Sequence, residues 1–175
     1  MVDILDAVIK RYRDDIGLKD KEGAIRAIQV NKEFERVDGE KTVALNNLDI
    51  EIKAGEFVCL IGPSGWGKST LLRLIAGLIA PSSGELKLDD KEIDGPGHER
   101  GLVFQDPTLF PWLTIYDNIS YGLKIRHLYK EYKRQVEDFI ELVGLKGFEK
   151  SFPHQLSGGM AQRASLARAL VNNPK

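Results

Sequence analysis

The glycine-rich stretch GPSGWGKST, at residues 62–70, most constrains the fold of this chain. It matches the pattern G-x-x-x-x-G-K-[S/T], in which backbone amides surround a phosphate group. The continuous apolar run EFVCLIG at 56–62 precedes it and is typical of a buried strand. The run STLLRLIAGL at 69–78 follows it and predicts a helix that closes at Gly77. The sequence therefore predicts a strand, a phosphate-binding loop and a helix in succession.

Each residue type in this loop has a chemical reason to be there. Glycines let the backbone turn without a Cβ clash, and the dipole of the following helix favours an anion. Lys68 supplies a positive charge for the β- and γ-phosphates, and Ser69 supplies a hydroxyl for Mg²⁺. The expected nucleotide-binding residues are Gly62, Pro63, Ser64, Gly65, Trp66, Gly67, Lys68, Ser69 and Thr70. The alternative is a glycine turn with a solvated lysine, but a chance match is on the order of 1%. We expect a nucleoside triphosphate to bind.

Composition and charge set broad limits on function. The 175 residues suit one domain, and a formal net charge of −1 offers no global field for nucleic acid, so we expect no nucleic-acid partner. The single cysteine, Cys59, excludes an internal disulfide, and its apolar neighbours predict a small buried hydrophobe. The amino terminus carries aspartates where a signal peptide needs a basic stretch, and Arg73 interrupts the longest apolar run. We therefore expect a cytoplasmic protein.

Alternating and β-branched residues predict a strand-rich first part of the chain. The expected strands are AIQVNKEF at 27–34, VALNNLDIEI at 43–52, a hairpin over 84–93 that turns at Asp89–Asp90, and a buried strand RGLVFQ at 100–105.

Helical spacing of apolar residues dominates the second part. The expected helices cover 114–125, 130–145 and Ser157 toward Asn172, with a further short helix possible at 3–16. These patterns divide the chain into three parts. The expected parts are an amino-terminal extension over 1–23, a phosphate-binding core with an antiparallel β part over 24–105, and a helical subdomain over 106–175.

The stretch LSGGMAQRASLARAL at 156–170 places two glycines at the start of a helix, which makes it a second candidate anion site. Together with GPSGWGKST and LVFQD, in this order, it resembles the nucleotide-binding subunit of an ABC transporter over residues 24–175. The resemblance implies an α/β fold, namely a P-loop NTPase of ABC type with a strand-rich nucleotide-binding core and a helical subdomain. It also implies ATP and Mg²⁺ as cofactors.

In this family two nucleotide-binding subunits meet head to tail around two ATP molecules. The resemblance therefore implies that Ser157, Gly158 and Gly159 contact the nucleotide held by the partner's P-loop. Met160 stands where the family most often has glutamine, but the Ser-Gly-Gly core is intact.

Two further residues match functional positions of the family. Gln105 matches a glutamine that approaches Mg²⁺ and the attacking water, so it joins Ser69 as a metal residue and Lys68 as a catalytic one. Its alternative role is a polar residue that ends a strand. Phe34 matches an aromatic residue that stacks on adenine, a contact worth roughly 1–3 kcal/mol. The alternative for Phe34 is a core phenylalanine.

The segments GPGHERGLVFQ and LFPWLT narrow the resemblance to subunits of nitrate, sulfonate and taurine importers. This implies a membrane permease as partner, a periplasmic or extracellular solute-binding protein indirectly, and a place on the inner face of the cell membrane. The implied permease contact is the apolar cluster Leu109, Phe110, Pro111 and Trp112. Packing inside the helical subdomain is the alternative, and it fits Phe110 better than Trp112.

The family pattern continues past Lys175 into a strand that ends in Asp-Glu and, later, a histidine. We therefore expect residues 1–175 to lack the Walker B strand with its carboxylates, and to hydrolyse ATP poorly on their own. Two other interpretations are a soluble ABC-type ATPase acting on DNA or ribosomes, and a non-catalytic nucleotide-binding module. The first of these would need tandem domains or a large insertion, and the chain has neither.

Overall fold

The computed structural model describes residues 22–175, and the predicted helix at 3–16 lies outside them. The described residues form two compact units, 22–100 with Lys175 and 101–174.

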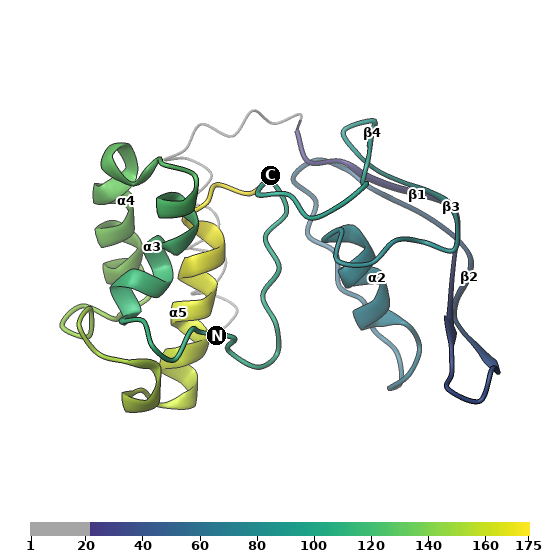
Figure 1. Cartoon of the computed structure of the whole chain (residues 1–175). Helices are drawn as coiled ribbons and strands as arrows, with labels where there is room; N and C mark the ends of the chain where they lie inside the picture. Colours follow the sequence, from purple (N-terminus) through teal and green to yellow (C-terminus); the bar gives the residue numbers. More distant parts are fainter. Residues whose placement is uncertain (1–21) are drawn as a thin grey trace. The chain divides into compact units, whose positions relative to one another are not determined.

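A four-stranded antiparallel sheet forms the first unit (Figure 1). Its spatial order is β2-β1-β3-β4, so β1 lies between β2 and β3. The strands are β1 (Ile25–Glu35), β2 (Lys41–Ile52), β3 (Ser83–Leu88) and β4 (Lys91–Glu92). The strands predicted at 27–34 and 43–52 are confirmed. Their partners lie close along the chain, so turns bring them together.

The hairpin predicted at Asp89–Asp90 is confirmed. Leu88 pairs with Lys91, and both turn residues have positive φ, 49° and 65°. Asp residues tolerate this left-handed backbone, and a two-residue turn of this kind matches the twist of the strands. The Asp89 carboxylate also accepts hydrogen bonds from the amides of Gly23 and Ala24, at 2.7 and 3.0 Å.

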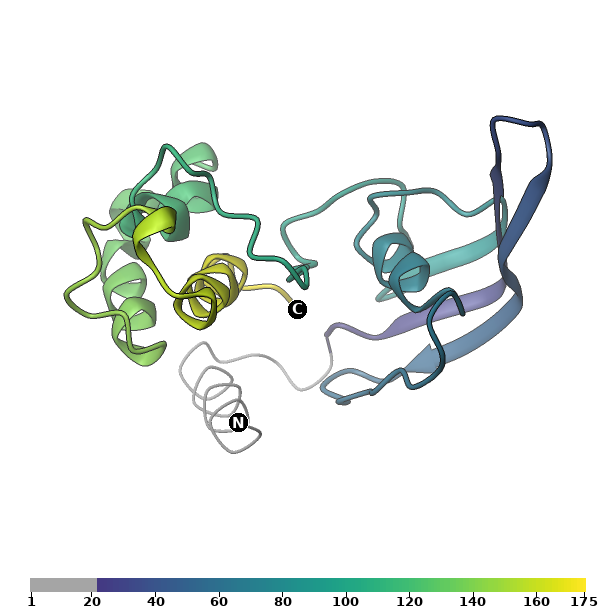
Figure 2. The ribbon, with the colours of Figure 1, turned by 90° about the horizontal axis from the view of Figure 1, so that it is seen from below.

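The helix α2 (Lys68–Ile75) covers one face of this sheet, as Figure 2 shows. Leu74 is buried against residues of β1 and β3, and this contact forms the core of the unit. The helix ends as predicted, because Gly77 has φ 73° and the Leu78 amide returns to the Arg73 carbonyl at 2.9 Å. The core consists of Ala27, Val30, Leu74, Leu86, Leu88 and Ile93.

Two predicted strands are wrong. Neither EFVCLIG at 56–62 nor RGLVFQ at 100–105 is a strand; both are irregular backbone. Phe57 is 72% exposed and Ile61 is 94% exposed, and Cys59 is exposed rather than buried. A strand needs partners for its amides and carbonyls, and within the described residues neither run pairs with another strand. Apolar composition alone therefore did not determine burial here.

The second unit is a helical bundle, shown in green and yellow in Figure 1. Its elements are α3 (Ile115–Ile125), α4 (Tyr129–Leu142), a 3₁₀ turn η1 (Pro153–Gln155) and α5 (Gly158–Leu170). The predicted helices are confirmed within a few residues at each end. The predicted apolar faces are confirmed as well, because all of their members are buried: Ile115, Ile119, Leu123, Val136, Phe139, Ile140 and Val143.

Small residues bring α5 close to α3. Ala161, Ala164 and Ala167 are buried along α5, and their short side chains permit close approach. Gly122 of α3 lies against the side chain of Asn172, where an added Cβ would collide with the amide group. Across residues 22–175, no helix is both long and apolar enough to cross a membrane.

Candidate nucleotide-binding site

In the loop 62–70, called the phosphate loop below, two of the three glycines have a left-handed backbone. Gly65 and Gly67 have φ values of 85° and 77°, in the left-handed region that side chains disfavour. Gly67 caps α2, whose first intrahelical hydrogen bond runs from the Leu71 amide to the Gly67 carbonyl at 2.8 Å. The amides of Lys68, Ser69 and Thr70 precede that bond, so the helix does not use them. They point from the helix amino terminus as donors for an anion.

Gly67 is needed for a second reason, which the sequence did not indicate. A Cβ at this position would collide with the Ala44 carbonyl and lie 2.8 Å from Leu45 Cδ2. The loop therefore passes directly against β2. An added Cβ at Gly65 would meet nothing within 4 Å, so the loop is tightly packed at one glycine and open at the other.

The Lys68 side chain folds back over its own loop. Its Nζ donates to the carbonyls of Gly62 and Pro63, at 2.7 and 2.6 Å. The ammonium is thus held by the backbone of the loop that leads into α2, and the Pro63, Ser64 and Trp66 side chains of this loop are exposed. An ammonium, a row of amides and the Ser69 hydroxyl form a donor set suited to phosphoryl oxygens. The residues present thus fit the triphosphate of a nucleotide.

The described residues supply fewer ligands for Mg²⁺ than donors for the phosphates. Mg²⁺ in such sites is held by the substrate phosphates with one or two carboxylates. Residues 22–175 contain no cluster of three His, Cys, Asp or Glu side chains that could hold a metal ion. The Ser69 hydroxyl fits the role of a single ligand beside the phosphates.

The residues Ser157, Gly158 and Gly159, called the signature, begin α5 as a capped helix. The Ser157 hydroxyl accepts a hydrogen bond from the Met160 amide at 3.3 Å, and the first intrahelical bond joins the Ala161 amide to the Ser157 carbonyl at 2.9 Å. An added Cβ at Gly158 or Gly159 would meet nothing within 4 Å. Gly158 and Gly159 are exposed residues, and their amides precede the first intrahelical bond, which suits contact with an anion on another molecule.

The other two predicted site residues are exposed. Phe34 lies on β1 with 39% of its surface exposed, so it is not a core phenylalanine, and Lys32 Nζ lies 5.1 Å from its ring centroid. Gln105 lies in irregular backbone, so it does not end a strand. The Gln162 side chain of α5 donates to the carbonyl of Phe104, the residue before Gln105, at 2.9 Å.

The apolar cluster 109–112 divides between packing and exposure. Leu109 is buried, whereas Trp112 is 70% exposed. Phe110 lies between these two residues in the sequence. Its ring contacts the rings of Trp112 and Tyr121, with centroid distances of 5.5 and 4.7 Å. The structure therefore gives Phe110 a packing role and presents Trp112 at the surface.

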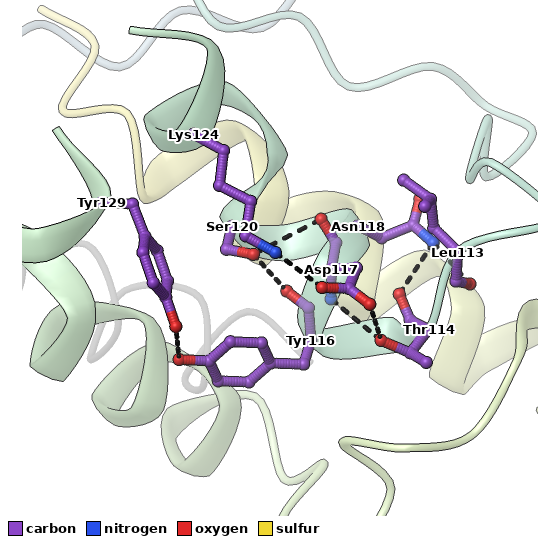
Figure 3. A network of polar contacts seen from close by, with 8 residues as sticks. All are labelled: Leu113, Thr114, Tyr116, Asp117, Asn118, Ser120, Lys124 and Tyr129. Atoms are coloured by element: carbon purple, nitrogen blue, oxygen red, sulfur yellow. Dashed lines mark hydrogen bonds and ion pairs between the residues drawn. The ribbon is translucent and has the colours of Figure 1, made fainter. Parts of the chain in front are cut away.

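Asn118 anchors this cluster, and the sequence analysis did not single it out. Figure 3 shows its side chain beside Leu113 and Thr114. Asn118 is fully buried; its Oδ1 accepts from the Phe110 amide at 2.8 Å, and its Nδ2 donates to the carbonyls of Phe110, Leu113 and Thr114 at 3.0–3.1 Å. In the sequence, the position of Asn118 between the apolar residues Ile115 and Ile119 of the predicted helix was the only sign of this role. One buried amide thus holds the loop's backbone.

A charged cap fixes the start of α3 next to this amide (Figure 3). The Thr114 hydroxyl accepts from the Asp117 amide at 3.1 Å, and the Asp117 carboxylate pairs with Lys124 at 2.6 Å. The hydrogen bond from Lys124, followed by that from Thr114, lowers the pKa of Asp117 below its ordinary value. Nearby, burial and then the hydrogen bond with Tyr129 raise the pKa of Tyr116.

The chain is similar in sequence to proteins of one family. Residues 45–175 match the family described as ABC transporter. The chain is 48% identical over 134 residues to the nitrate import ATP-binding protein NrtD of Synechocystis sp., covering 76% of this chain and 50% of that protein. It is 45% identical over 149 residues to the taurine import ATP-binding protein TauB of Pelagibacter ubique, covering 83% and 55% respectively. The chain thus spans about half the length of these curated relatives.

A solved structure matches the fold. A dimeric structure of a post-hydrolysis state of an ATP-binding cassette, bound to ADP and Pi, is similar with a TM-score of 0.76 at 34% identity. The match covers 86% of this chain and 70% of that chain.

Proposed function

Because the chain belongs to the ABC transporter family, we propose that the protein carrying it binds and hydrolyses ATP to energise the import of a small solute. The observation that carries the proposal is the phosphate loop at the start of α2. There the Lys68 ammonium bonds to the Gly62 and Pro63 carbonyls, and the first amides of the helix have no intrahelical partner. The relatives that import nitrate and taurine support a solute of nitrate, sulfonate or taurine type.

In this proposal the phosphate loop holds the β- and γ-phosphates of ATP. Lys68 exchanges its hydrogen bonds to the Gly62 and Pro63 carbonyls for phosphate oxygens, which as charged acceptors bind an ammonium more strongly. Mg²⁺ would supply charge neutralisation at the phosphates, with Ser69 and Gln105 as its protein contacts. Phe34 stacks on the adenine, since its half-exposed ring is available on β1.

The same proposal defines the partners. A second nucleotide-binding subunit packs head to tail, so that Ser157, Gly158 and Gly159 contact its ATP; the open surface beside both glycines supports this. A membrane permease docks at the 109–112 cluster through the exposed Trp112, and holds the protein at the inner face of the membrane. The solute-binding protein acts through the permease.

Nucleotide binding by a Lys68→Ala variant tests the proposal. We expect most of the affinity for a fluorescent ATP analogue to be lost, because the ammonium next to the phosphates is removed. Lys91→Ala, which removes an exposed lysine of β4 in the same unit, is the matched control and should bind like the unmodified protein. Equal affinity in Lys68→Ala and Lys91→Ala would contradict the assignment, provided that circular dichroism shows both variants folded.

A further inference from the structure

One hydrogen bond joins the signature helix α5 to the backbone that carries Gln105. Gln162 Nε2 donates to the Phe104 carbonyl at 2.9 Å. That carbonyl belongs to the same planar peptide group as the Gln105 nitrogen, so the bond restrains the orientation of the peptide plane that leads into Gln105. The surrounding residues, 101–109, lie in neither helix nor strand. Hydrogen bonds of a helix or sheet do not hold this peptide in place, so the hydrogen bond from α5 has a larger part in positioning it.

The Gln162 amide can make this contact in one orientation only. Its acceptor is a carbonyl oxygen, so the NH₂ end must face Phe104. The Oε1 at the other end is buried and has no hydrogen-bond partner among the residues that the structure describes. The bond to Phe104 is the favourable contact that this side chain does make.

The same helix begins at the signature residues. Ser157 caps α5, and Gly158 and Gly159 form its exposed first turn. Gln162 follows Ser157 by five residues, which corresponds to about 7.5 Å along the helix axis. A hydrogen-bonded helix transmits a displacement over this length, because its geometry has few soft degrees of freedom. A shift of the signature turn therefore reaches the Phe104 carbonyl directly.

We propose that Gln162 is a positioning residue that couples the two ATP sites of the dimer. This inference rests on the proposed function, in which the signature contacts the partner's ATP while Gln105 serves the ATP on its own P-loop. ATP arriving at the signature moves the start of α5, and Gln162 passes that movement to Gln105. Arg168 of α5 also donates to the carbonyl and the hydroxyl of Thr108, at 2.7 and 3.0 Å, but these bonds do not involve the Gln105 peptide.

Two substitutions in the full-length protein test this. Gln162→Glu keeps the size of the side chain but removes the donor and places a carboxylate oxygen against the Phe104 carbonyl. Gln162→Ala removes the side chain beyond Cβ. The matched control is Gln135→Glu, which removes a glutamine donor to Asn173 in the same unit but does not contact residues 101–109.

ATP turnover against ATP concentration, equilibrium ATP affinity and the unfolding midpoint are measured for each variant. We expect kcat to fall by about 2- to 30-fold in both Gln162 variants, the range seen for single residues that carry coupling. The Hill coefficient should move toward one, while ATP affinity and unfolding midpoint stay at the values of Gln135→Glu.

Unchanged kcat and Hill coefficient in both variants would overturn the inference. So would a parallel loss of kcat, ATP affinity and unfolding midpoint, because that pattern indicates a structural role alone. An unmodified protein without Lys68-dependent turnover would refute the proposed function itself, and this inference with it. Turnover by the unmodified protein and by Lys68→Ala tests the proposed function without the Gln162 variants, so its failure can be distinguished from failure of this inference.

Discussion

The two left-handed glycines of the phosphate loop allow backbone strain to be separated from steric collision. Both Gly65 and Gly67 have φ near 80°, at 85° and 77°. They differ in their surroundings, because a Cβ at Gly65 meets open space and a Cβ at Gly67 meets β2. We predict that Gly67→Ala destabilises the protein more than Gly65→Ala does.

The magnitude follows from these surroundings. A left-handed backbone costs an alanine about 1–2 kcal/mol, and both variants incur this cost. Gly67→Ala adds the collision with the Ala44 carbonyl and Leu45, and forcing such contact costs about 1–3 kcal/mol more. The collision is with strand backbone, which cannot move without disturbing the sheet. We therefore expect a loss of about 2–5 kcal/mol for Gly67→Ala and about 1–2 kcal/mol for Gly65→Ala.

Urea unfolding without nucleotide, followed by circular dichroism, measures both variants on the same scale. Nucleotide is omitted because ligand binding would add its own stabilisation to the unmodified protein. Equal destabilisation by the two substitutions would refute the reasoning, since it would mean that β2 does not limit the space at Gly67.

Two further predictions concern the helical unit. Asn118→Ala should destabilise by about 3–5 kcal/mol, because it leaves the Phe110 amide and the Leu113 carbonyl without this partner and removes one of the two donors to the Phe110 carbonyl. Urea unfolding beside the exposed Asn46→Ala should show this, and equal losses would contradict it. The pKa of Asp117 is lower in the folded protein than its ordinary value of 3.8. The stabilisation of the folded state by the ionised carboxylate is therefore fully present above pH 3.8, and it is lost as the pH falls through the folded-state pKa. Unfolding of the unmodified protein and Asp117→Asn from about pH 6 to about pH 2 should therefore show a stability difference that shrinks only at the acid end; a constant difference would argue against the Lys124 pairing.

Elements that depend on local interactions could be predicted from the sequence. The hairpin at Asp89–Asp90, the helix end at Gly77 and the buried faces of α3 and α4 all follow from residues within a few positions of each other. The family could also be predicted, because its motifs are short, ordered and chemically specific, and the match over 45–175 bears this out. The roles of Lys68, Gln105, Phe34 and Ser157 in nucleotide chemistry stay predictions.

Tertiary structure decided the features that depend on distant partners. The apolar run 56–62 has the composition of a buried strand, but a strand forms only where another strand supplies hydrogen bonds, and no spacing rule encodes that partner. The approach of Gly67 to β2 and the contact from Gln162 to Phe104 span 23 and 58 positions in the chain, so no local pattern announces them. Local propensity sets the secondary structure of helices and tight turns, because their hydrogen bonds close within a few residues. Strand pairing and the orientation of site residues follow only once the folded chain has brought remote segments together.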